Sequence, residues 1–171
     1  ATKLHVTGES EYNLQMKGYA HALRVNLSKN PSSILVDQNS KLHLSQATKG
    51  ASAVVLGNGA TLTMDNGTLI TEGNFLKGIY SIGSNSTTTI RNGSHVDVNS
   101  IVGTKSDKGQ KLIVTGGTLT YDYSADNTLW PVNDQGDKLT NFLLTKDEAH
   151  ANFDALSYNG QTYTYLSDLN K

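Results

Sequence analysis

An imperfect repeat in the middle of the chain limits the possible folds more than any other feature of the sequence. Three stretches, 61–69, 87–95 and 111–119, each join an alternating apolar segment to an Asn-Gly or Gly-Gly turn. The last glycine of the turn recurs at a nearly constant spacing, as Gly67, Gly93 and Gly117, and a weaker copy of the apolar segment lies upstream at 41–46. A regular period of roughly 20–50 residues is typical of solenoid proteins.

Each copy of the repeat carries two mainly apolar side chains two positions apart. Side chains at i and i+2 of a strand point to the same face, so we expect these pairs to face inward and to stack on one another. The pairs are Leu42 and Leu44, Leu62 and Met64, Thr88 and Ile90, and Leu112 and Val114. The residues between them are mostly polar and are expected to face outward.

Two further apolar segments accompany the copies. Those at 34–36, 54–56 and 79–82 precede a copy, and those at 68–71, 95–98 and 118–121 follow its turn. Three short strands per period predict an all-β fold, a right-handed parallel β-helix of about four to five coils. Asn-Gly between alternating segments is also the strongest short-range hairpin signal, which leaves an antiparallel sandwich as the alternative. The recurring period favours the solenoid.

The 171 residues are expected to form a single β-solenoid domain. We expect residues 1–30 to form an N-terminal cap or first coil, residues 31–124 the solenoid coils, and residues 125–171 a C-terminal capping element. Within the last segment, a capping box from Thr145 to Glu148 predicts a short helix through about residue 156. The segment 158–163 is typical of a hairpin.

Composition excludes several classes of partner and site. A formal net charge of −1 gives no electrostatic footprint for nucleic acid. No apolar run approaches the ~20 residues of a transmembrane helix, so membrane insertion is not expected. The absence of cysteine excludes disulfides, Cys-ligated zinc, iron–sulfur clusters and Cys nucleophiles. We expect no cofactor.

Acidic residues in the repeat show no arrangement that catalysis would require. A polysaccharide lyase needs a base and charge neutralisation, often by calcium on clustered carboxylates, and a hydrolase needs two carboxylates at a defined separation. Asp65 and Arg91 occupy equivalent sites in successive coils, which predicts an ion pair, and the register brings Asp97 near Asp122. We expect no catalytic residue and no metal ligand.

The five histidines show no spacing typical of a metal site. His95 falls where the repeat places Leu69 and Leu119, which predicts a buried or edge histidine, with a pH-sensitive contact as the alternative. Histidines become cationic in mildly acidic surroundings, so a pH-dependent binding activity is a further hypothesis.

Candidate ligand-binding residues lie where the period fails. The chain is rich in aromatic residues just after the last copy, and aromatic faces stack on sugar rings and dominate interfaces, although cross-strand packing is the alternative. Irregular inserts at 72–77 and 103–109 are expected to bulge from one edge of the solenoid. The candidates are Tyr121, Tyr123, Trp130, Asn74, Lys77 and Lys105.

Two segments of the repeat region are 54–67, VVLGNGATLTMDNG, and 78–90, GIYSIGSNSTTTI. On these residues, the stretch from about 34 to 123 resembles the pectate-lyase-like β-solenoid adhesive domains of Gram-positive surface adhesins, including the epithelium adhesins of lactobacilli. The resemblance implies an extracellular, cell-wall-anchored bacterial protein whose solenoid binds host epithelium, mucus or polysaccharide without catalysis. The matching motif encodes coil geometry, so no binding residue of the family is carried over.

The function expected from these observations is that of a non-catalytic adhesin domain, a monomer that binds host epithelial or mucus glycans and glycoproteins. Its mechanism would combine weak polar contacts, a few aromatic stacks and avidity from many copies per cell. A polysaccharide lyase or hydrolase of the same fold is one alternative, and a structural stalk segment is the other.

Overall fold

The computed structural model describes residues 3–25, 32–139, 150–154, 157–158 and 161–162, with side chains in the first two ranges. Sheet A contains, in spatial order, β1 (Lys3–Val6), β4 (Ser33–Asp37), β7 (Thr61–Asp65), β10 (Thr87–Arg91), β13 (Lys111–Val114) and β15 (Pro131–Val132). Sheet B contains β2 (Glu11–Met16), β5 (Lys41–Gln46), β8 (Thr68–Gly73), β11 (His95–Asp97), β14 (Thr118–Asp122) and β16 (His150–Asp154). Sheet C contains β3 (Leu23–Val25), β6 (Ser52–Leu56), β9 (Lys77–Ser81) and β12 (Ile101–Val102).

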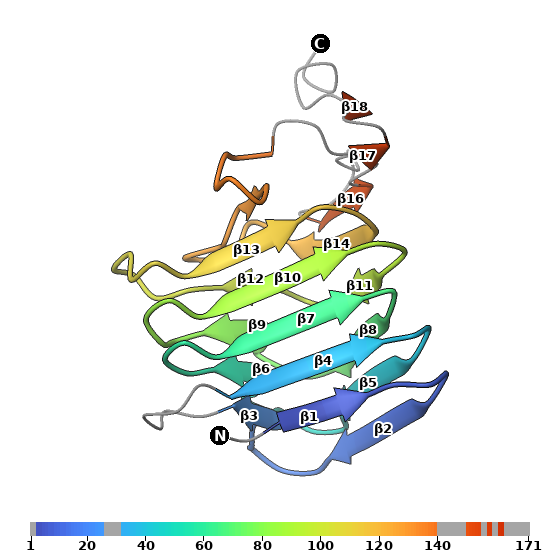
Figure 1. The fold of residues 1–171 in the computed structure, drawn as a ribbon. Coiled ribbons are helices and arrows are strands. Elements are labelled where there is room, and N and C mark those ends of the chain that lie inside the picture. The colour runs from blue at the N-terminus through green and yellow to red at the C-terminus, as the bar shows by residue number, and fades with distance from the viewer. Residues whose placement is uncertain (1–2, 26–31, 140–149, 155–156, 159–160, 163–171) are drawn as a thin grey trace.

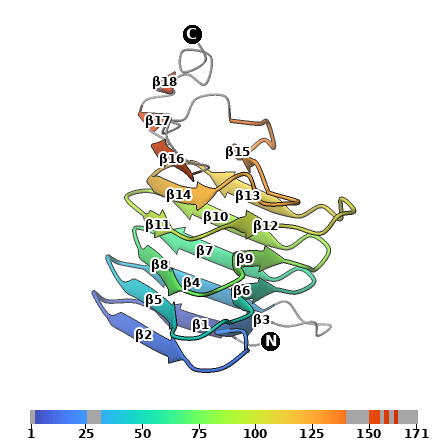
Figure 2. The ribbon, with the colours of Figure 1, turned by 180° about the vertical axis from the view of Figure 1, so that it is seen from behind.

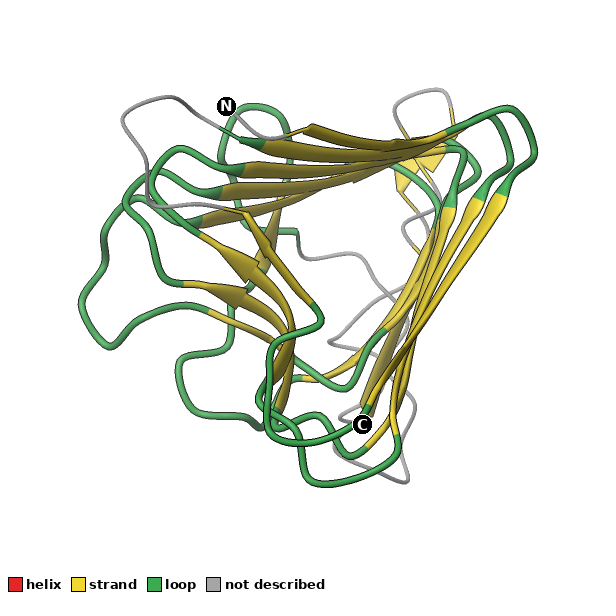
Figure 3. Ribbon diagram, turned by 90° about the horizontal axis from the view of Figure 1, so that it is seen from below, coloured by secondary structure: helices red, strands yellow, loops and turns green. Residues whose placement is uncertain are grey.

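The chain passes through the three sheets in turn, so each circuit adds one strand to each sheet. The stack of coils is seen from opposite sides in Figures 1 and 2. Viewed along the stack, the sheets form the walls of a roughly triangular tube whose interior is the core (Figure 3). Strand pairing from β1 to β15 is parallel in all three sheets. Four complete coils and a fifth that β13 and β14 begin confirm the expected parallel β-solenoid.

The register corrects one part of the repeat. Leu62 stacks on Ile34, and Leu42 stacks on Leu69, so 41–46 lies in sheet B and is not a copy of 61–69. Every strand of the tube has the same two-residue alternation, so the pattern identifies a strand without identifying its sheet.

The coils also become shorter along the tube. The first residues of five strands of sheet A are aligned by the register, and the distance in sequence from each one to the next decreases at every step. These residues are Lys3, Ser33, Thr61, Thr87 and Lys111. The repeat is therefore regular in its shape and variable in its length.

The corner between sheets A and B depends on one backbone conformation. Asn39, Asn66, Asn92 and Gly117 all have positive φ, from 54° to 88°, which Asn and Gly adopt at the lowest cost. The corner after β10 holds one residue more than the corners after β7 and β13. His95 therefore pairs with Thr68 and Thr118 and is exposed, where alignment of the repeat had placed it opposite Leu69 and Leu119.

Inward-facing side chains form columns along the tube. One column in sheet B contains Leu42, Leu69, Val96 and Leu119, all fully buried and stacked in successive coils. Burying a side chain of this size stabilises the fold by about 1.5–3 kcal/mol. Because each coil covers the one below it, the apolar face of every interior coil is closed from both sides.

At the N-terminal end, residues 3–25 form the first coil, one of the two alternatives expected for residues 1–30, and their inward-facing Tyr12 remains 41% exposed because no described coil lies beyond it. At the other end, 150–154 is the strand β16, antiparallel to β14, so the helix predicted through residue 156 is wrong over this range. Residues 145–149 lie outside the described residues.

The pairing with β14 explains this difference, because a strand added to sheet B makes backbone hydrogen bonds along its length, which outweigh a local capping signal. The predicted hairpin is confirmed as the antiparallel pair β17 (Ser157–Tyr158) and β18 (Gln161–Thr162).

Candidate functional site

A long loop connects β12 and β13. It leaves sheet C after Val102 and returns to sheet A at Lys111, and it bulges beside the start of β13 (Figure 1). The insert predicted at 103–109 is therefore confirmed. The insert predicted at 72–77 is wrong: β8 extends through Gly73, β9 begins at Lys77, and Phe75 between them is buried in the core.

A groove of about 480 Å³ opens between this loop and a later segment of the chain. One wall comes from 104–112 and the other from 127–138; we call this site the corner groove. Its volume lies within the ~300–1,000 Å³ that small-ligand sites occupy.

The first wall is held by one amide side chain. Gln110 Oε1 accepts hydrogen bonds from the backbone N–H of Thr104 at 3.1 Å and from its hydroxyl at 3.3 Å, which closes the loop across its base. Gln110 Nε2 donates to the carbonyl of Gly83 in the coil below, at 3.4 Å. The wall is thus tied both to itself and to the solenoid.

The second wall is held by backbone contacts with the last coils. The N–H of Leu129 donates to the carbonyl of Ile101 at 2.9 Å, and Val102 and Thr128 form a β-bridge. Trp130 donates its indole N–H to the carbonyl of Leu139 at 3.2 Å, which fixes the orientation of the ring. Both walls are therefore arranged before any ligand arrives, which lowers the entropic cost of binding.

The surfaces of the corner groove are of two kinds. Leu112, Leu129, Trp130 and Val132 supply apolar surface. Hydroxyl, amide and charged groups supply the polar surface: Thr104, Gln110, Asn127, Thr128, Asp107 and the lysines 105, 111 and 138. An aromatic ring beside hydrogen-bonding groups is a combination that suits a sugar, which has an apolar ring face and a hydroxylated edge.

Of the six predicted ligand-binding residues, the structure brings Lys105 and Trp130 together in the corner groove. Tyr121 is fully buried, and its hydroxyl donates to the carbonyl of Leu129 at 3.0 Å, so it supports the groove wall from the core side. Burial also raises the pKa of the Tyr121 phenol far above its ordinary value. Tyr123 is half-buried against the core, as the packing alternative predicts.

Asn74 and Lys77 lie away from the corner groove, at the turn between β8 and β9. The Lys77 ammonium sits 3.8 Å from the centroid of the Tyr80 ring, a cation–π contact that keeps it on its own strand. Asn74 Nδ2 donates to the carbonyl of Ala47 at 3.4 Å. Both residues therefore make contacts within their own corner of the solenoid.

Sequence reasoning missed several residues of the corner groove. Lys111 stands at the start of a repeat copy, and the sequence analysis did not single out Lys138. The available signal was the position of Lys111 next to the 103–109 insert, since the residue after a bulge lies at its base. No sequence signal linked Lys138 to Lys105.

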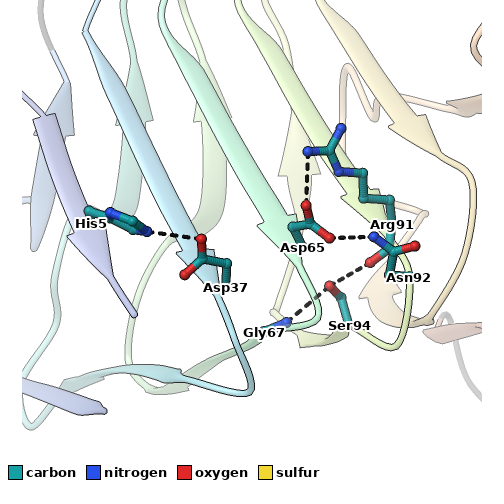
Figure 4. Close-up of polar contacts among 7 residues, drawn as sticks. All are labelled: His5, Asp37, Asp65, Gly67, Arg91, Asn92 and Ser94. Atoms are coloured by element: carbon teal, nitrogen blue, oxygen red, sulfur yellow. Dashed lines mark hydrogen bonds and ion pairs between the residues drawn. The ribbon is translucent and has the colours of Figure 1, made fainter. Parts of the chain in front are cut away.

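The outward face of sheet A carries a second set of polar contacts, at the end where each strand enters its corner (Figure 4). Arg91 Nη2 lies 2.9 Å from Asp65 Oδ2, which confirms the predicted ion pair, and Asn92 also donates to this carboxylate. One coil pair below, His5 Nε2 lies 3.0 Å from Asp37 Oδ2. The Thr7 hydroxyl, followed by His5, holds the pKa of Asp37 below its ordinary value.

Asp97 and Asp122, which the repeat had placed near each other, are not direct partners in the register. The register sets Asp97 opposite Thr120, so Asp122 is diagonal to it, and Asp122 Oδ1 accepts hydrogen bonds from the backbone and hydroxyl of Ser124. Among the residues that the structure describes, no group of three or more His, Cys, Asp or Glu side chains could hold a metal ion. The same residues include no helix that is long and apolar enough to cross a membrane.

Comparisons with protein-family models, with curated proteins and with solved structures found no match to this chain. The chemistry of the corner groove therefore follows from its own residues, which offer an aromatic face, hydrogen-bonding groups and positive charge. Such a set favours non-covalent binding of a polar ligand.

Proposed function

We propose that this chain is a non-catalytic adhesive domain that binds host epithelial or mucus glycans and glycoproteins through the corner groove. The observation that carries the proposal is the position of Trp130, which lines an open groove of about 480 Å³ beside hydroxyl, amide and ammonium groups. A glycan ring can lie against the indole while its hydroxyl groups bond to Thr104, Asn127 and Thr128.

The lining residues favour binding over hydrolysis. A glycoside hydrolase places two carboxyl groups on either side of the scissile bond. Asp107 is the one acid among the described residues that line the groove, and its Oδ1 accepts a hydrogen bond from the backbone N–H of Gly109 at 2.8 Å. A single carboxylate engaged in its own turn does not supply the acid and base that hydrolysis needs.

The proposed setting is the outer surface of a Gram-positive cell, with the domain as a monomer held by an anchor elsewhere in the protein. This part of the proposal rests on the resemblance of 54–67 and 78–90 to lactobacillus-type adhesins. Weak single-site binding suits such a setting, since many copies per cell convert weak contacts into firm attachment.

The test is a glycan array probed with the purified chain, with Trp130→Ala as the groove variant and Tyr19→Ala as its control. Tyr19 is 69% exposed and lies in the first coil, so its loss removes an accessible aromatic ring without touching the groove. We expect binding to selected glycans that falls about tenfold or more in Trp130→Ala and is unchanged in Tyr19→Ala. Lys105→Gln serves as a second groove variant, and thermal unfolding checks that each variant is folded.

Three results would count against the proposal. No binding to any glycan or mucin at high density would favour a stalk segment. Release of unsaturated or shortened products from polysaccharide would show a lyase or a hydrolase. Equal loss of binding in Trp130→Ala and Tyr19→Ala would place recognition outside the corner groove.

A further inference from the structure

Positive charge is concentrated at the corner groove although the chain as a whole has a formal net charge of −1. Lys105, Lys111 and Lys138 line the groove with exposed side chains, and Asp107 is the one acid that the described part of the chain adds to this lining. The lysines come from three separate places: the 103–109 loop, the start of β13 and the strand-like bridge with Val132.

None of these three lysines forms an ion pair with another described residue, whereas other charged groups on the outward faces do. Lys41 pairs with Glu11, and Arg91 pairs with Asp65. Three lysines and one acid among the described lining residues therefore give the groove a net positive charge.

The lysines line the same groove as the aromatic ring of Trp130. The indole of Trp130 is fixed by its bond to the carbonyl of Leu139, and Lys138 and Lys111 line the same groove. An anionic group attached to a ring satisfies both features at once: the ring packs on the indole, and the anion lies among ammonium groups. A neutral sugar packs on the indole but brings no negative charge to the ammonium groups.

We propose that the corner groove selects acidic oligosaccharides, in which a carboxylate or sulfate group on the sugar is bound by Lys105, Lys111 and Lys138. This inference rests on the proposed glycan-binding function and adds the class of sugar. Lysine binds an anion as a point charge without the bidentate geometry of arginine, so the site accepts either anion. Binding weakens as salt rises, because the lysines are exposed to solvent.

The experiment measures the affinity of the chain for three soluble polysaccharides of similar length: polygalacturonate, dextran sulfate and neutral dextran. Each is titrated at low and at physiological salt. The groove variant replaces Lys105, Lys111 and Lys138 with Gln. Its control replaces Lys3, Lys17 and Lys49 with Gln, three exposed lysines outside the groove whose loss changes the net charge by the same amount.

We expect one or both acidic polymers to bind at least about tenfold more tightly than dextran, with a loss of about tenfold in the groove variant and less than about twofold in the control. The carboxylate and sulfate arms identify the anion. Trp130→Ala is expected to weaken the same arm, and polyglutamate, which has charge without sugar rings, is expected to bind weakly.

Equal binding of dextran and the acidic polymers, with no effect of the lysine substitutions, would overturn this inference and leave glycan binding in place. Polyglutamate that binds as tightly as the acidic polysaccharides, or an equal loss in the two triple variants, would also overturn it. Binding of no polysaccharide in any arm, together with a blank glycan array, would remove the proposed function itself.

Discussion

The guanidinium of Arg91 lies 2.9 Å from the carboxylate of Asp65, and the two residues are direct partners in the parallel register of β10 and β7. The Asp65 carboxylate also accepts a hydrogen bond from Asn92, the residue that turns the chain out of β10. One acid therefore joins two coils at the corner between sheets A and B. The arrangement indicates a scaffold role for the charged residues of this face.

Replacing either Arg91 or Asp65 should lower the free energy of unfolding slightly, and the two replacements should differ in size. Both side chains are partly exposed, 49% for Arg91 and 28% for Asp65, so Arg91→Gln should lower the free energy of unfolding by about 0.2–1 kcal/mol. Asp65→Asn should cost more, since it also weakens the bond to Asn92. Urea unfolding of both single variants and the double variant measures the coupling; a coupling of zero would show that the pair adds no stability.

The pKa of Asp37 predicts how stability responds to acid. Its folded pKa lies below the ordinary value of 3.8, first because of the Thr7 hydroxyl and then because of His5. The stabilising contribution is therefore complete above 3.8 and is lost as the pH falls through the folded pKa. The difference in unfolding free energy between the wild type and Asp37→Asn should therefore shrink as the pH falls below 3.8.

NMR titration of the Asp37 carboxyl group provides a direct measurement. Thr7→Val removes the largest cause of the shift, so the pKa of Asp37 should move up towards its ordinary value. His5→Gln should have a smaller effect. An unchanged pKa in Thr7→Val would assign the shift to another group.

Two glycines with nearly the same positive φ should differ in their tolerance of a side chain. Gly73 and Gly18 have φ of +82° and +86°, but a Cβ at Gly73 would lie 2.2 Å from the carbonyl oxygen of Gln46, whereas at Gly18 nothing lies within 4 Å. Gly18→Ala should cost about 1–2 kcal/mol from the left-handed conformation alone. Gly73→Ala should cost about 1–3 kcal/mol more from the clash between coils. Equal costs, measured by thermal unfolding, would show that the corner can shift.

Thr88 occupies a core column of otherwise apolar residues and is fully buried between Leu62 and Leu112. Its hydroxyl has no hydrogen-bond partner in the described part of the chain. Thr88→Val keeps the shape and removes the buried polar group, so it should stabilise the fold by about 1 kcal/mol. Thr89→Val changes the outward neighbour on the same strand and should stay within about 0.5 kcal/mol. A loss of stability in Thr88→Val, measured by urea unfolding, would indicate a hidden partner for the hydroxyl.

The buried Tyr121 phenol should make the stability of the fold depend on pH in the alkaline range. Tyr121→Phe removes the hydrogen bond to the Leu129 carbonyl and should cost about 1 kcal/mol at neutral pH. Burial raises the pKa of the phenol, so the stabilising contribution of Tyr121 is present below the ordinary tyrosine value of 10.0 and is lost as the pH rises towards the folded pKa. Above pH 10.0 the difference in unfolding free energy between the wild type and Tyr121→Phe should therefore narrow. Ultraviolet absorbance follows the ionisation of tyrosines, and ionisation of Tyr121 at the same pH as the exposed tyrosines would contradict its burial.

Local sequence patterns were sufficient to predict the solenoid. Alternation of period two specifies strands with an inward face, and Asn or Gly at each corner allows the positive φ that turns the chain from sheet A to sheet B. The Asp65–Arg91 pair could be predicted for the same reason, because a regular coil brings equivalent positions of successive repeats into contact. These features depend on residues that are adjacent in sequence or on a nearly constant number of residues between equivalent positions of successive coils.

The sequence could not indicate which strands stack on each other where the number of residues per coil changes. The coils shorten steadily from β1 to β13, and one extra corner residue moved His95 from an inward to an outward position. The helix expected near the C-terminal end failed for a related reason, since the long-range pairing of β16 with β14 outweighed a local capping signal.

The corner groove was decided by tertiary structure alone. The sequence marked Lys105 and Trp130 as separate irregular features, and only the closed circuit of the solenoid sets them in one groove with Lys111 and Lys138. The physical reason is that strand alternation and corner conformation are local preferences, which depend on residues adjacent in the sequence. The groove arises from the spacing between coils, which is set by backbone hydrogen bonds between segments far apart in the chain.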